Sequence, residues 1–142
     1  FYRLLQDDAR EQVWCTTYPY PDVEANSWYS NQVATLTNAG ILAGFPDGTF
    51  RPNTEITRAE VMEIINNVLF RTPDKEHFLP DMIKWPDNSN TDAWYYTDVQ
   101  EATNNHDYER VNNHSPETWT KITQARDWKA LEAELAQKYP DR

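Results

Sequence analysis

The stretch of sequence that decides the fold is residues 40–60, GILAGFPDGTFRPNTEITRAE. Gly40 can adopt the left-handed backbone conformation that ends a helix. The tripeptide Pro46-Asp47-Gly48 has the residues that a tight turn prefers, and the apolar residues on either side predict two short strands. Thr57 and Glu60 have the spacing of a capping box, in which each side chain binds a backbone N–H of the first helical turn. The stretch therefore predicts a helix end, a turn between short strands, and a helix start.

Arg58 stands at the first position of this second helix, where the positive end of the helix dipole disfavours a cation. One explanation is structural, with the side chain solvated or paired with a carboxylate. The other is functional: Arg58 faces an anion that it shares with the free N–H groups of the first helical turn. The spacing leaves both explanations open.

The composition limits the kinds of partner that the chain can bind. The 142 residues carry a net charge of −10, so we expect no basic surface for nucleic acid or for an anionic membrane. Hydrophobic residues make up 39% and the mean hydropathy is −0.88, which predicts a small core built largely from six Trp, eight Tyr and five Phe. Such aromatic residues are equally suited to carbohydrate. No apolar run is long enough to span a bilayer, so membrane insertion is not expected.

Residues with catalytic, metal-binding or cofactor-binding chemistry do not form a recognisable pattern. Cys15 is the only cysteine, which excludes a disulfide within the chain and a zinc site built from cysteines. His77, His106 and His114 are not spaced as metal ligands are, and no nucleophile stands in a known catalytic motif. We therefore expect no catalytic residues, no metal and no cofactor.

Periodic apolar residues predict helices on both sides of the central stretch. One helix is expected from residue 28 to about residue 39, on the spacing of Trp28, Tyr29, Val33 and Leu36. A second is expected from residue 58 to about residue 71, with an apolar stripe formed by Val61, Ile64, Ile65, Val68 and Leu69. A further amphipathic helix begins near Asp127, and residues 7–18 predict a helical segment followed by a loop.

The pattern that precedes the central stretch occurs twice. Trp94-Tyr95, Val99 and Ala102 follow Trp28-Tyr29, Val33 and Leu36 at a constant offset of 66 residues, which indicates an internal repeat. After residue 104 the second copy diverges. It lacks the Pro-Asp-Gly turn and has Lys121 in place of the arginine.

Together these motifs resemble the S-layer homology (SLH) family. The resemblance is carried by the aromatic-Pro-Asp opening at residues 20–22, by Trp28-Tyr29, by residues 40–52 and by the segment Ile56-Thr57-Arg58-Ala59-Glu60. It covers residues 20–71 closely and residues 85–126 loosely. It implies a mainly α fold of tandem helix–loop–helix modules, three of which usually form a pseudo-threefold spindle.

The resemblance also implies five parts in the chain. They are the end of a preceding truncated module with its connector, a complete module, a linker, a divergent module and a C-terminal amphipathic helix, at residues 1–19, 20–72, 73–84, 85–126 and 127–142. Upstream domains of the same polypeptide are then expected partners.

In function, the resemblance implies a non-catalytic anchoring module, outside the cell, at the bacterial surface or cell wall. The usual ligand of the family is a secondary cell-wall polysaccharide, often with a pyruvate ketal, bound in grooves between modules. The ketal carboxylate would be the anion for Arg58. Trp28 would stack on a sugar ring, Gly44 would let the glycan approach the backbone, and the remaining glycan-binding positions would be Asp22, Asp47 and Gly48.

Several of these residues also have a structural explanation. Trp28 would then belong to the core, Gly44 and Asp47 would only shape turns, and Asp22 would cap a helix or a loop. Because the divergent module lacks the arginine, the alternative function is a structural or protein-interaction module of a surface protein with a degenerate glycan site. A glycan hydrolase is the least supported reading, since no two carboxylates stand at a distinctive spacing.

Overall fold

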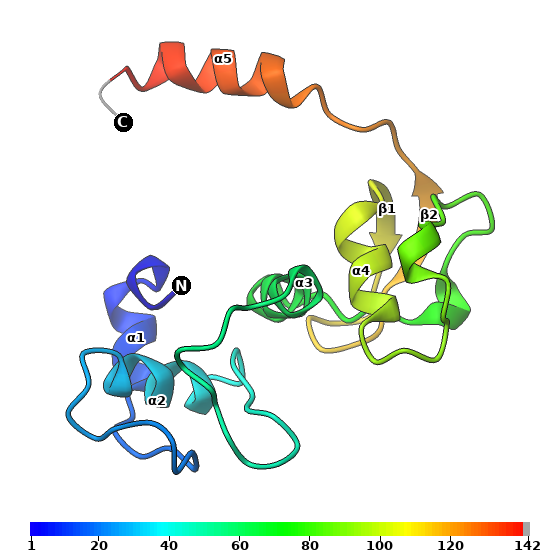
Figure 1. Cartoon of the computed structure of the whole chain (residues 1–142). Helices are drawn as coiled ribbons and strands as arrows, with labels where there is room; N and C mark the ends of the chain where they lie inside the picture. Colours follow the sequence, from blue (N-terminus) through cyan, green and yellow to red (C-terminus); the bar gives the residue numbers. More distant parts are fainter. Residues whose placement is uncertain (141–142) are drawn as a thin grey trace. The chain divides into compact units, whose positions relative to one another are not determined.

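The computed structural model describes residues 1–140, and the chain divides into two compact units. The first unit is Phe1–Phe70 and the second begins at Arg71. Figure 1 shows the order of the elements along the chain. The two units are described separately below.

The first unit contains a short 3-10 helix and three α-helices. They are η1 (Tyr2–Leu4), α1 (Asp7–Val13), α2 (Ser30–Asn38) and α3 (Arg58–Val68). The helix that residues 7–18 predicted is α1, and the predicted end of α2 at Gly40 is confirmed by its positive φ of 71°. The predicted helix from residue 28 begins two residues later, because Trp28 and Tyr29 lie in the turn that precedes α2.

The core of the first unit is small and rich in aromatic residues. Tyr20, Val23 and Val33 are buried together, and Tyr18, Tyr29 and Phe50 pack against them. The rings of Tyr20 and Phe50 lie 5.1 Å apart between centroids. A few large rings therefore replace the aliphatic side chains that this polar sequence lacks.

The central stretch forms the predicted turn and helix start, but the predicted strands are wrong. Gly48 has a φ of 82° and donates its N–H to Phe45 O at 2.9 Å, while Phe45 N donates to Thr49 O at 2.8 Å. Residues 41–56 contain no strand, because this turn carries the backbone contacts and no neighbouring strand pairs with it. The capping box at Thr57 is confirmed.

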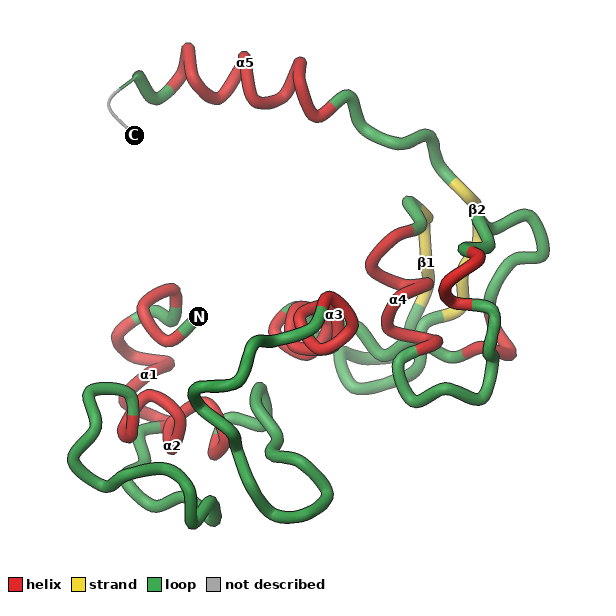
Figure 2. Tube along the Cα trace, viewed as in Figure 1, coloured by secondary structure: helices red, strands yellow, loops and turns green. Residues whose placement is uncertain are grey.

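The second unit mixes helices with a hairpin (Figure 2). Its elements are η2 (Lys75–His77), η3 (Pro86–Asn88), α4 (Tyr96–Thr103), β1 (His106–Glu109), β2 (Thr118–Ile122) and α5 (Trp128–Lys138). The two strands pair antiparallel, with a register shift between Asp107 and Tyr108. The predicted helix near Asp127 is confirmed as α5, which that residue caps by accepting the N–H of Ala130.

The expectation of a mainly α fold is wrong. Helix covers only 39% of the chain, and an antiparallel pair of strands stands in the second unit. The cause lies in residues 119–122, where Lys121 takes the place of Arg58 and a helix start like that of α3 would be needed. They lie in β2 instead, and Lys121 lies opposite Asp107 in the pair. Thr, Trp and Ile favour a strand, and this segment has no capping box to begin a helix.

Residues 73–84 pack within the second unit. Phe78 lies against Trp119 at 4.5 Å between ring centroids, and Ile83 donates its N–H to Asn104 Oδ1 at 2.7 Å. Among the described residues, no helix is long and apolar enough to cross a membrane.

Candidate functional site

Arg58 is the first residue of α3, and its side chain is exposed. In the described part of the chain, the guanidinium takes part in no hydrogen bond or ion pair. The nearby carboxylate of Glu60 is already engaged, because its Oε2 accepts the N–H of Thr57 at 2.7 Å and the hydroxyl of Thr57 at 2.8 Å. These bonds lower the pKa of Glu60, so that it stays ionised. Of the two structural explanations, the ion pair is therefore not formed among the described residues, whereas a solvated side chain agrees with the exposure of Arg58.

Asp22 holds the loop that precedes α3. Its two carboxylate oxygens accept the N–H groups of Phe50 at 2.9 Å and of Arg51 at 2.7 Å. The bond from Phe50 and then the bond from Arg51 lower the pKa of Asp22. Arg51 has a φ of 57°, a conformation that is uncommon outside glycine. Asp22 thus fixes a strained backbone at the end of the turn.

Asp47 closes the same loop from the other side. Its Oδ1 accepts the Thr49 hydroxyl at 2.6 Å and the Thr49 N–H at 3.0 Å, and its Oδ2 accepts Arg51 Nη2 at 2.5 Å. These bonds lower the pKa of Asp47 to about 2. The Arg51 guanidinium also lies over the Phe45 ring, 4.0 Å from its centroid. We call residues 45–51 the clamped loop.

Gly44 has a structural reason to be glycine. A Cβ at this position would lie 2.3 Å from Tyr20 Cε1 and 2.6 Å from Thr49 O, so a side chain would displace the core or the clamped loop. Gly48 is required for a different reason, since its positive φ allows the turn. Neither observation tests whether a glycan lies nearby.

Trp28 is 84% exposed, so it is not a core residue. It meets Tyr29 edge to face, with 5.5 Å between ring centroids and planes at 89°. This contact orients the indole and covers at most one of its faces. The structure brings Asp22 and Asp47 together at the clamped loop, but among residues 1–140 no hydrogen bond, ion pair or ring contact joins Trp28 to Arg58.

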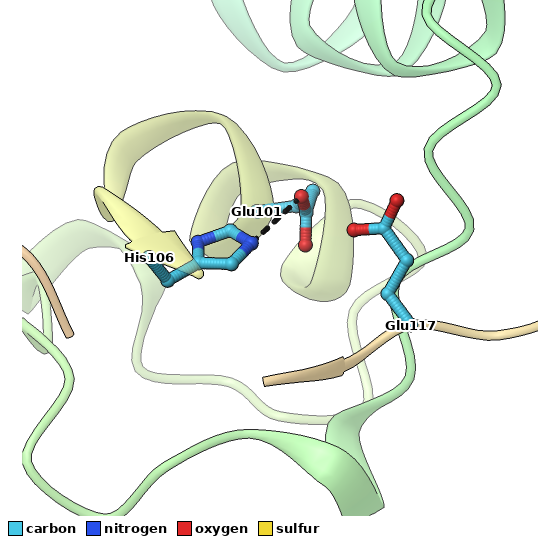
Figure 3. Close-up of side chains that lie close together, drawn as sticks. All are labelled: Glu101, His106 and Glu117. Atoms are coloured by element: carbon cyan, nitrogen blue, oxygen red, sulfur yellow. Dashed lines mark ion pairs between the residues drawn. The ribbon is translucent and has the colours of Figure 1, made fainter. Parts of the chain in front are cut away.

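A buried ionic cluster lies in the second unit (Figure 3). Glu101 on α4, His106 on β1 and Glu117 before β2 bring their ligand atoms within 4.8 Å of one another. Arg71 binds all three: its Nε lies 2.8 and 2.9 Å from the Glu117 oxygens, its Nη2 lies 2.9 Å from His106 Nε2, and it forms an ion pair with Glu101. Arg71 therefore supplies the positive charge that a metal ion would bring.

The surroundings of this cluster fix each side chain. His106 donates from Nδ1 to Asn104 O at 2.8 Å and stacks on Trp119, with centroids 3.9 Å apart. Trp119 Nε1 donates to Glu101 Oε2 at 3.0 Å. Burial opposes ionisation of Glu101, but its bond and charge contact with His106, together with Arg71, lower its pKa.

The pKa of Glu117 shifts in the opposite direction to that of Glu101. Its side chain is fully buried, and burial together with repulsion from Glu101 raises its pKa, despite the bonds from Arg71. Sequence reasoning missed this cluster because its members are far apart in the chain and are residue types that usually lie on the surface.

Comparisons with known proteins identify the class of the first unit. Residues 19–62 match the model of the S-layer homology domain. The chain thus carries an S-layer homology domain over these residues, which confirms the resemblance seen in the motifs. No solved structure matches the chain.

The named relatives include an anchoring protein, a cell surface glycoprotein and an outer membrane protein. The chain is 36% identical over 87 residues to the cellulosome-anchoring protein of Acetivibrio thermocellus, which covers 61% of this chain and 18% of that protein. It is 31% identical over 83 residues to cell surface glycoprotein 1 of the same organism, covering 57% of this chain and 3% of that protein. It is 42% identical over 50 residues to the outer membrane protein SlpA of Thermus thermophilus, covering 35% of this chain and 6% of that protein.

The chain spans less than a fifth of the length of each of these relatives. The domain match and these relatives, together with a surface layer protein of Brevibacillus choshinensis that is 32% identical over 71 residues, indicate a location at the cell surface or in the cell wall.

Proposed function

We propose that this chain is a non-catalytic module that anchors a surface protein to the cell wall by binding a polysaccharide with a carboxylate substituent. The observation that carries the proposal is the exposed, unpaired guanidinium of Arg58 at the start of α3. A cation at this end of a helix is unfavourable by itself, and an anion bound there reverses the sign of the interaction.

A carboxylate on a sugar, such as a pyruvate ketal, suits this position. The planar guanidinium can donate two parallel hydrogen bonds to a carboxylate, and a lysine cannot reproduce that geometry. The capping box supports the arrangement, because it holds the first turn of α3 and keeps Glu60 from competing for Arg58.

In this proposal Trp28 gives a flat apolar surface to a sugar ring. The clamped loop would contribute through its shape, which depends on Gly44, Asp47, Gly48 and Asp22. This loop lies close enough to α3 for the charge of Arg51 to lower the pKa of Glu60. The cargo would be the other domains of the same polypeptide, as the cellulosome-anchoring relative suggests.

The test compares binding of the wild-type chain and of Arg58→Ala to polysaccharide released from Acetivibrio thermocellus cell walls by enzymatic digestion of the peptidoglycan, which leaves acid-labile ketals intact. Arg58→Ala is expected to lose about 30-fold in affinity, since hydrogen bonds to charged groups contribute about 2 kcal/mol. Arg58→Lys should recover only part of this loss. Arg126→Ala, which removes an exposed arginine of the second unit, is the control and should bind as the wild type does.

The alternative is a structural or protein-interaction module. The observation that favours it is the strand β2, which stands where the second copy of the pattern would need a capped helix start. Equal binding by the wild type and Arg58→Ala would support this alternative, and release of reducing ends from the polysaccharide would contradict both.

A further inference from the structure

Asp47 and Gly48, in the clamped loop, form the only Asp-Gly pair in the sequence. An aspartate that precedes glycine is especially prone to close into a succinimide ring, because glycine has no side chain to shield its backbone nitrogen from the carboxyl group before it. Ring closure requires a protonated carboxyl group, a backbone nitrogen that is free to attack, and a side chain that is free to rotate. The contacts of the clamped loop bear on all three requirements.

The reaction consists of two steps that balance with water alone. In the first step, the Gly48 nitrogen bonds to Asp47 Cγ and loses its proton, and one carboxyl oxygen leaves as water. In the second step, water opens the ring at one of its two carbonyl carbons. Attack at Cγ breaks the new bond and restores aspartate. Attack at the backbone carbonyl carbon breaks the original peptide bond and leaves the main chain running through Cγ, which is isoaspartate.

Both reacting groups are held in other bonds in the folded chain. Asp47 Oδ1 accepts the Thr49 hydroxyl at 2.6 Å and the Thr49 N–H at 3.0 Å, and Oδ2 accepts Arg51 Nη2 at 2.5 Å. The Gly48 N–H is donated to Phe45 O at 2.9 Å. Attack on Cγ therefore requires that these bonds break first. The Asp47 side chain is half exposed, so water, the second reactant, reaches it whenever they do.

The same bonds keep the Asp47 carboxyl group ionised, and an ionised carboxylate cannot lose water to form the ring. They lower the pKa of Asp47 from its ordinary 3.8 to about 2, with the hydroxyl and the N–H of Thr49 as the largest causes and Arg51 next. The protonated, reactive fraction at neutral pH is smaller in proportion. Because water screens contacts at an exposed site, we expect a reduction of about tenfold in the rate of ring closure.

We propose that Asp47 is a site of spontaneous isomerisation to isoaspartate, and that the contacts of the clamped loop hold this reaction back in the folded chain. Isoaspartate carries one more carbon atom in the main chain and one fewer in the side chain. The bonds from Asp47 to Thr49 and Arg51 would then not re-form in the same geometry, so the modification would open the loop. This inference does not depend on the proposed function, because it concerns the loop whether or not a glycan binds to the chain.

The experiment incubates the full chain at pH 7 in water labelled with oxygen-18, since each ring opening adds one labelled oxygen at residue 47. Mass spectrometry of the peptide that contains Asp47 measures the uptake. The folded wild type should take up label about tenfold more slowly than the same chain unfolded in urea. Thr49→Val and Arg51→Gln, with folding checked by circular dichroism, should react at rates between these two. Arg126→Gln, which removes an exposed arginine of the second unit, is the control and should react as the wild type does.

Three results would overturn the inference. They are equal uptake at residue 47 by the folded and the unfolded wild type, folded Thr49→Val and Arg51→Gln chains that react as slowly as the wild type, and uptake in urea that is no faster at Asp47 than at the other aspartates. A variant that fails to fold should react at the rate of the wild type in urea, and a slower rate would also count against the proposal.

Discussion

Replacing Arg71 with methionine should destabilise the second unit, because it leaves two buried carboxylates without their main counter-charge. Arg71 contacts Glu117 with Nε and Glu101 with Nη2, and both glutamate side chains are almost completely buried. Removing one partner from a buried ion pair typically costs about 3–5 kcal/mol. Arg110, 3.3 Å from Glu117, and His106, 3.2 Å from Glu101, remain in place. We therefore expect a loss near the lower end, about 3 kcal/mol at pH 7.

The loss of stability in Arg71→Met should depend on pH in a defined direction. Without Arg71, the pKa of Glu117, which burial already raises, should rise further, and the pKa of Glu101 should rise because it loses the charge of Arg71. A carboxylate whose pKa is raised in the folded state favours folding below its unfolded pKa, and this contribution is lost as pH rises through the folded pKa. The difference between wild type and Arg71→Met should therefore be smallest near pH 4 and should grow toward pH 7.

Urea unfolding measures the difference in free energy of unfolding between wild type and Arg71→Met. It is followed by far-ultraviolet circular dichroism and by the Trp119 indole N–H resonance. Trp119 reports on the cluster directly, since its Nε1 donates to Glu101. Arg126→Met is the control for loss of an exposed arginine, and Glu117→Gln added to Arg71→Met should recover part of the stability. A loss below about 1 kcal/mol at pH 7, or a loss that is the same at pH 4 and pH 7, would refute the reasoning.

Three further outcomes test the first unit. Gly44→Ala should lower its free energy of unfolding by about 2 kcal/mol, because a Cβ would overlap Tyr20 and Thr49 O; an unchanged melting temperature would contradict this. Thr57→Ala should cost about 1 kcal/mol by removing the cap of α3, as measured by urea unfolding. Since the pKa of Asp47 is lowered to about 2, its bonds to Thr49 should persist above pH 4 and be lost toward pH 2, as a titration of the Thr49 amide resonance would show.

Local features of the fold could be predicted from the sequence. The capping box at Thr57 and the turn at Gly48 depend on residues three or four positions apart, so their side chains and backbone preferences are visible in the chain itself. The strands expected beside that turn did not form, because a strand needs a partner and the sequence does not show where one lies.

Features that depend on distant residues could not be predicted. The ionic cluster joins Arg71, Glu101, His106 and Glu117 across 46 positions of the chain, and each residue alone resembles a solvated surface group. The exposure of Trp28 was also open, since the same spacing fits a core helix and an exposed turn. For the candidate site, the sequence singled out Arg58, and the structure adds that no carboxylate within residues 1–140 neutralises it.

The clamped loop has a consequence for the kinetics of attachment. Because the hydrogen bonds of Asp22, Asp47 and Arg51 already hold this backbone, a polymer that bound as proposed would not have to order the loop. Encounter should then be limited by diffusion and orientation of the glycan, and the lifetime of the attached state should set its strength. If the proposed anchoring function holds, the loop would be ready to bind as soon as the chain has folded, whether or not wall material is within reach.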